Sequence, residues 1–135
     1  MTHQTRSDYL EPEEIARLVD RFYEKVRHDA LLGPVFNPVI ADWDEHKVLM
    51  TSFWCSVALG AGTYRGNPMA AHRPLGATLE HFERWLALWR ETTGEELNTW
   101  AADAMRNFAE RIGHSLKLGL GLNPAAKSFG MPLVR

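Results

Sequence analysis

The residue best suited to chemistry in this 135-residue chain is a single histidine in an unusual setting. His72 lies between Pro68 and Pro74, on a segment with room for about one helical turn. Aromatic-rich amphipathic stretches flank it, at 46–59 and 81–89. Because a neutral imidazole keeps a lone pair on one ring nitrogen, a histidine between two apolar helices is suited to bind a haem iron. The two prolines stiffen the segment and lower the entropy lost in fixing the ligand direction.

The elements that must position His72 begin with a well-marked helix. Pro12 suits its first turn, where a missing N–H costs little. Apolar residues then recur at spacings of three and four across residues 15–26, which is the period of a helix. Gly33-Pro34 is expected to end this element or its trailing turn.

A second helix is predicted over about 43–58, directly before the His72 segment. Asp42 or Asp44 is expected to cap its start, and Gly60 and Gly62 to end it. Its apolar residues form more than one stripe, which predicts burial on two sides.

Two further helices are predicted after His72. Thr78 is expected to cap the third, which Thr92-Thr93-Gly94 should break. The fourth is predicted over about 95–118. No stretch alternates as a strand would, so the chain is predicted to be all-α, with four main helices and short accessory turns.

The bulk composition is that of an ordinary globular protein, with 45% hydrophobic and 24% charged residues. We expect one domain over 1–135, with flexible tails at 1–10 and 120–135. The net charge is −2, and the basic residues are dispersed, which argues against a nucleic-acid partner and against a membrane partner. The polar N-terminus and the lone Cys55 favour a cytoplasmic location.

Several segments together resemble one known family, the group III truncated haemoglobins, over roughly residues 13–118. The glycine-glycine motifs of the other two groups of truncated haemoglobins are missing at the inter-helix corners. The matching segments are Phe22-Tyr23, Gly33-Pro34-Val35-Phe36-Asn37, His46, Phe53-Trp54, Tyr64-Arg65-Gly66-Asn67-Pro68-Met69, His72 and His81-Phe82-Glu83-Arg84-Trp85-Leu86.

This resemblance implies a two-over-two helical sandwich around haem b, which is iron protoporphyrin IX. His72 would be the proximal iron ligand, and Tyr23, His46 and Trp85 would face the opposite side of the haem, where oxygen binds. Arginines near His72 would pair with the haem propionates, and apolar side chains would form the pocket wall. The remaining cofactor-binding residues would be Phe36, Met50, Phe53, Leu75, Leu79, Phe82, Arg65 and Arg73.

Each distal residue also has a plain structural interpretation. Tyr23 is either a core tyrosine satisfied by the backbone or a hydroxyl donor to a bound ligand. His46 is either a solvated histidine at a helix start or a donor and gate that swings between pocket and solvent. Trp85 is either core bulk or an indole donor, since its N–H cannot accept. Trp54 is interpreted as a packing residue.

The predicted function is that of a haem protein that binds oxygen or related diatomic gases, for storage, transport or sensing. The alternative is an enzyme in the same pocket, for nitric oxide dioxygenation or peroxidase-like chemistry. Three donors over one ligand exceed what simple carriage needs, which favours chemistry or sensing. An enzyme of this kind would need a separate reductase, because the sequence has no flavin or nicotinamide motif. A third interpretation is a haem-free helical interaction module.

Overall fold

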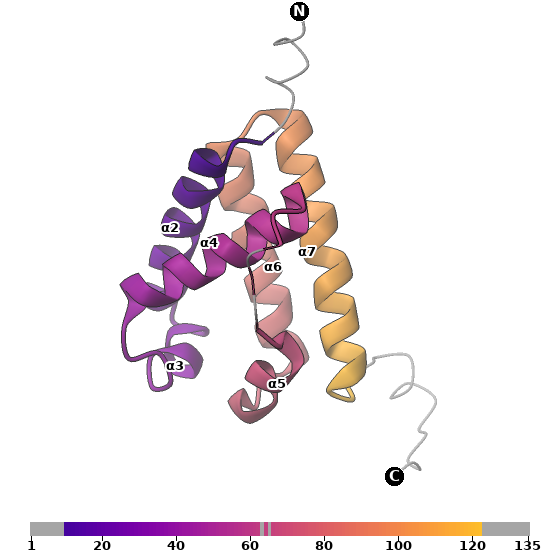
Figure 1. Cartoon of the computed structure of the whole chain (residues 1–135). Coiled ribbons are helices and arrows are strands. Elements are labelled where there is room, and N and C mark those ends of the chain that lie inside the picture. The colour runs from indigo at the N-terminus through magenta and orange to yellow at the C-terminus, as the bar shows by residue number, and fades with distance from the viewer. Residues whose placement is uncertain (1–9, 63, 65, 123–135) are drawn as a thin grey trace, which may run out of the picture.

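The computed structural model describes residues 10–62, 64 and 66–122 (Figure 1). All regular structure in these described residues is helical. None of the helices found there is long and apolar enough to cross a membrane. The elements are α2 (Pro12–His28), α3 (Gly33–Phe36), α4 (Trp43–Leu59), α5 (Pro68–His72), the 3₁₀ turn η1 (Arg73–Leu75), α6 (Leu79–Glu96) and α7 (Thr99–Gly119).

The four long helices form two packed pairs. α2 packs against α4 and also against α6, and α6 lies along α7. Figure 1 shows α4 crossing over α6, with α7 running beside α6. α5, which carries His72, contacts α7. The all-α architecture with four main helices, predicted from sequence, is therefore confirmed.

Polar caps fix where the first two long helices begin. Glu11 precedes Pro12 and forms a reciprocal capping box with Glu14, whose carboxylate accepts from the Glu11 N–H at 2.9 Å. Of the two candidate caps for α4, Asp42 is the one used: its side chain accepts from the Glu45 N–H at 3.1 Å. Gly60 then ends α4 in the left-handed conformation, at φ 68°.

The predicted break at Thr92-Thr93-Gly94 is wrong, because α6 continues through it to Glu96. The Thr92 hydroxyl donates to the Leu88 carbonyl at 2.7 Å, and the Thr93 hydroxyl donates to the Trp89 carbonyl at 2.9 Å. Both threonines thus satisfy their buried hydroxyls within the helix. The turn comes later, and Asn98 caps α7.

The prediction that α4 is buried on two sides is also wrong. Trp54 is its one fully buried residue, whereas Val48 is 72% exposed and Leu49 is 46% exposed. The apolar residues of α4 outside the core lie in two different environments. Leu49 lines the cavity described below, and Val48 faces solvent.

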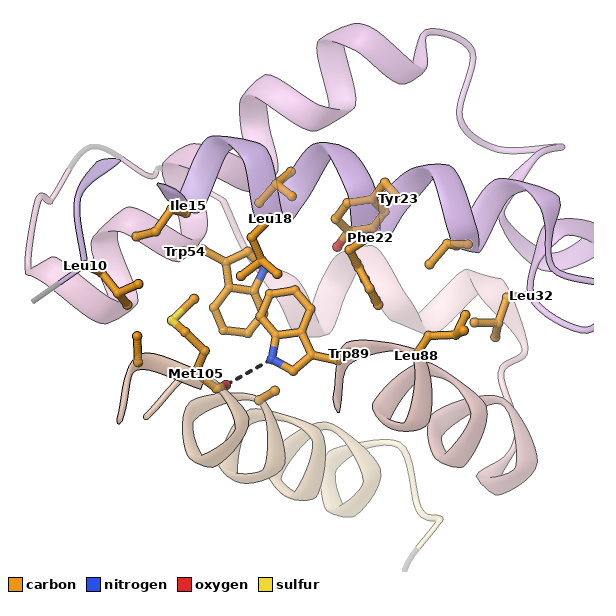
Figure 2. Close-up of a cluster of buried hydrophobic side chains, with 14 residues drawn as sticks. Leu10, Ile15, Leu18, Phe22, Tyr23, Leu32, Trp54, Leu88, Trp89 and Met105 are labelled. Atoms are coloured by element: carbon orange, nitrogen blue, oxygen red, sulfur yellow. Dashed lines mark hydrogen bonds between the residues drawn. The ribbon is translucent and has the colours of Figure 1, made fainter. Parts of the chain in front are cut away.

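Aromatic rings fill the centre of the core (Figure 2). Trp54 stacks on Trp89 with ring centroids 4.5 Å apart, and Phe22 meets Trp89 edge-on at 4.8 Å. The Trp89 indole N–H donates to the Met105 carbonyl at 3.0 Å. Each such aromatic pair contributes about 0.5–1.5 kcal/mol beyond the area that it buries. These rings hold α2, α4, α6 and α7 together.

The predicted tails lie largely outside the described residues. Leu10 is the exception at the N-terminal end, because it is buried in the same core cluster. At the other end, residues 120 and 121 form a turn after α7.

Candidate functional site

A cavity of about 400 Å³ lies beside the aromatic core, between α4, α5, α6 and α7. Most of its wall is aliphatic or aromatic carbon. The lining side chains that carry polar groups include Tyr23, His46, His72, His81 and Trp85. Its size falls in the range of about 300–1,000 Å³ that is typical of small-molecule and cofactor sites.

His72 is held by its own helix. Its Nδ1 lies 2.7 Å from the Pro68 carbonyl oxygen. A carbonyl only accepts, so Nδ1 carries the ring proton and the neutral ring keeps its lone pair on Nε2. The Asn67 side chain caps α5 by accepting from the Ala70 N–H at 3.1 Å. Residue 72 therefore offers a cavity-lining imidazole whose tautomer is that of a metal ligand.

His81 lines the same cavity in the opposite tautomer. Its Nδ1 accepts from the Thr78 backbone N–H at 2.9 Å, which closes the capping box at the start of α6. Because that N–H can only donate, the proton of the neutral His81 ring is on Nε2. His81 is therefore suited to donate a hydrogen bond and unsuited to bind a metal through Nε2.

Tyr23 projects from the buried face of α2 and is only 4% exposed. Its ring packs edge-on against Phe22 and against His46, at centroid distances of 4.8 and 5.3 Å. Burial raises the pKa of the Tyr23 hydroxyl well above its usual value, and the neighbouring Trp54 N–H opposes this rise. The hydroxyl consequently stays protonated and can donate into the cavity.

His46 lies near the start of α4, with its ring edge-on to Tyr23 and to Trp43. Burial lowers the pKa of His46, and the positive charge that His72 can carry lowers it further. The ring is therefore neutral at pH 7.

Trp85 reaches the cavity from the middle of α6. Phe22 packs edge-on against its ring at 4.9 Å, and Trp89 stacks on it at 5.4 Å. The indole is therefore clamped by the core and cannot rotate freely.

The structure brings most of the predicted site residues together. Leu79 and the exposed Arg73 lie outside the cavity lining, and Arg65 is not among the described residues. The predicted wall residues that do line the cavity are Phe36, Met50, Phe53, Leu75 and Phe82.

Sequence reasoning missed many of the lining residues, among them Leu49, Trp54, Tyr64 and His81. Leu49 carried a usable signal, since it follows His46 at helical spacing. Trp54, interpreted as a packing residue, packs in the core and lines the cavity at once. The sequence alone did not indicate that His81 lines the cavity. Its tautomer is set by the hydrogen bond to the Thr78 N–H at the start of α6, which only the structure shows.

The chemistry of the cavity lining suits an apolar group that carries a metal. Its walls are apolar, and one imidazole presents an unprotonated Nε2. A further observation is the buried Trp54 Nε1–H, which has no hydrogen-bond partner within the described residues. Such an orphaned donor ordinarily costs about 1–3 kcal/mol, a cost that is tolerated more often at sites than in plain cores.

Comparison with known proteins agrees with this geometry. Residues 11–114 match the family described as bacterial-like globin. The chain is 41% identical over 103 residues to the group 3 truncated haemoglobin of Campylobacter jejuni, covering 73% of this chain and 78% of that protein. The crystal structure of a group III truncated haemoglobin from Campylobacter jejuni is similar, with a TM-score of 0.78 and 36% identity, over 82% of this chain and 91% of that one. The chain therefore belongs to the bacterial-like globins, a family of haem-binding proteins, and within them to the group III truncated haemoglobins.

Proposed function

We propose that the cavity holds haem b, with His72 as the proximal ligand, and that the protein binds oxygen or a related diatomic gas. One observation carries this proposal: the Pro68 carbonyl holds the His72 Nδ1 proton, so Nε2 is left as a ligand. When bound, haem iron supplies reversible binding of the diatomic molecule. Arg73, next to His72 in sequence, is a candidate partner for a propionate.

The distal residues would determine how firmly that molecule is held. Tyr23 keeps its proton and would donate through its hydroxyl, and Trp85 would donate through its indole N–H. Neutral His46 would act as a third donor or as a gate. The apolar wall excludes water, which strengthens hydrogen bonds inside the pocket.

Optical spectra of the purified protein test the proposal. We expect a red protein with an intense Soret band at about 400 nm, because haem would be ligated. His72→Ala should lose haem or release it much faster, whereas His81→Ala should retain the iron ligand. A colourless protein that takes up no added haemin would contradict the proposal that the cavity holds haem.

A second candidate, nitric oxide dioxygenation or peroxidase-like chemistry, is favoured by the donor set. Tyr23, His46 and Trp85 all line one cavity, and several donors help to polarise an O–O bond. Turnover of nitric oxide by the oxygenated protein, with a separate reductase supplied, would separate this enzyme from a gas binder.

A further inference from the structure

Trp54 has a buried polar atom that the proposed function does not use. Its side chain is 2% exposed, and its Nε1–H has no hydrogen-bond partner in the part of the chain that the structure describes. Two other tryptophans differ: Trp89 donates to the Met105 carbonyl at 3.0 Å, and Trp43 donates to the Asn37 side chain at 3.1 Å. The Trp54 N–H is therefore a donor beside the cavity whose hydrogen bond is not made within the described residues.

Packing fixes the direction of this donor. The Trp54 ring stacks on Trp89 at 4.5 Å and on Trp85 at 6.4 Å, both with an interplanar angle of 24°. Phe53 meets it edge-on at 5.1 Å. With rings on several sides, the indole cannot turn its N–H toward bulk water.

The Tyr23 hydroxyl is the group that Trp54 meets. In Figure 2, the Tyr23 oxygen and the Trp54 nitrogen lie on the edges of the two rings that face each other. Burial is the larger influence on the pKa of Tyr23 and raises it, while the Trp54 N–H lowers it by acting as a hydrogen-bond donor. Trp54 thus faces the Tyr23 hydroxyl as a donor, although no hydrogen bond between the two is completed in the described structure.

A tyrosine hydroxyl has one proton to donate and two lone pairs to accept with, whereas an indole N–H only donates. If Trp54 occupies a lone pair of Tyr23, the proton of Tyr23 must point elsewhere. The cavity, which both residues line, is the open direction. A hydroxyl that accepts one bond also becomes a stronger donor in the next.

We propose that Trp54 is a positioning residue of the ligand pocket, whose indole N–H donates to the Tyr23 hydroxyl oxygen and so turns the Tyr23 proton toward the cavity. This rests on the proposed function, in which Tyr23 donates to the bound gas. Trp54 acts through Tyr23 and does not touch the ligand.

The first test uses carbon monoxide as a probe of the ferrous haem protein, because hydrogen-bond donation lowers the C–O stretching frequency. Trp54→Phe should raise the frequency part of the way that Tyr23→Phe raises it. It should also speed oxygen release roughly threefold to tenfold, the effect of one ordinary hydrogen bond. In a Tyr23→Phe background, Trp54→Phe should change neither quantity further.

Trp89→Phe is the matched control, because it removes a stacked indole whose N–H is already bonded to Met105. It should lower the Tm and leave the C–O frequency unchanged. A frequency change as large as that of Trp54→Phe would make the effect one of packing and overturn the proposal. An equal effect of Trp54→Phe with and without Tyr23 would overturn it too, since Trp54 would then donate to the ligand directly.

A second test needs neither haem nor a Trp54 variant. In the ¹⁵N-labelled apoprotein, Tyr23→Phe should shift the Trp54 indole resonance upfield and leave that of Trp89 in place. An unmoved Trp54 resonance would refute the contact. If this resonance moves but Tyr23→Phe leaves the C–O frequency unchanged, the distal role of Tyr23 fails, and the positioning role falls with it.

Discussion

Neighbouring groups give the three cavity histidines different chemistry. His72 donates from Nδ1 to a carbonyl, which leaves Nε2 as a ligand, and His81 accepts at Nδ1 from a backbone N–H, which puts the proton on Nε2. His46 packs against aromatic rings, and its burial favours the neutral form. All three line the cavity, and the tautomers favour His72 over His81 for the proposed role of iron ligand.

At the same scale, the distal donors should control oxygen release. In the proposed haem pocket, Tyr23→Phe or Trp85→Phe would remove one donor to a ligand that carries partial negative charge. The expected loss is about 1.5–3 kcal/mol, or roughly ten- to hundredfold in rate. Stopped-flow displacement of oxygen by carbon monoxide measures the off-rate. Leu86→Met changes the wall at nearly constant volume and should have little effect. Off-rates that neither donor variant changes would rule out the distal cage.

His46 should make the apoprotein sensitive to mild acid. Burial lowers its pKa in the folded state, so below about pH 6.5 the unfolded chain binds more protons at this residue than the folded chain does. His46 therefore costs stability as the pH falls through 6.5. Urea unfolding from pH 7.5 to 5 should show a shallower loss of stability in His46→Gln than in wild type. The exposed His114→Gln should keep the wild-type slope, and an equal slope in all three would contradict the burial of His46.

Residue-level prediction from sequence succeeded where a side chain sat in a recognisable motif. Tyr23, His46, His72 and Trp85 all line the cavity as expected, although their roles remain predictions. The dual position of Trp54 could not be predicted, since only the packed helices show which groups each edge of an indole faces.

At the scale of elements, local patterns located the helices well and their ends less well. The starts of α2, α4 and α6 follow the expected proline, aspartate and threonine. The predicted helix end at 92–94 was wrong because two threonines and a glycine are typical of a helix terminus. Their hydroxyls instead bond back to the carbonyls of Leu88 and Trp89, and tertiary packing outweighs local propensity.

The short helix α5 should link helix capping to haem retention. Asn67→Ala removes its cap and should cost about 1 kcal/mol, since the Asn67 side chain accepts from the Ala70 N–H. Asn98→Ala removes the equivalent cap of α7, where the bond to the Ala101 N–H is 2.8 Å. Both variants should lower the Tm of the apoprotein, but only Asn67→Ala should speed the transfer of haemin to a scavenger globin. Equal haemin loss from both variants would show that α5 has no special role.

At the scale of the molecule, core and cavity share one wall. Trp54 belongs to the buried cluster and Trp85 packs against it, yet both also line the cavity. The all-α class followed from the hydrophobic period and the sandwich from the family resemblance. The shared wall could not be inferred, because it depends on how α4 crosses α6. Ligand binding and folding stability should therefore be coupled.

That coupling predicts a large thermal shift with a defined origin. Haemin at 1,000 times its Kd adds about 4 kcal/mol, which for a chain of this size raises the Tm by roughly 10–20 °C. Iron-free protoporphyrin fills the same apolar cavity but cannot be ligated by His72. We expect it to give a smaller shift, equal in wild type and His72→Ala, while haemin stabilises wild type more than the variant. The difference isolates the bond to His72, so equal haemin shifts in both proteins would assign the iron ligand to another residue.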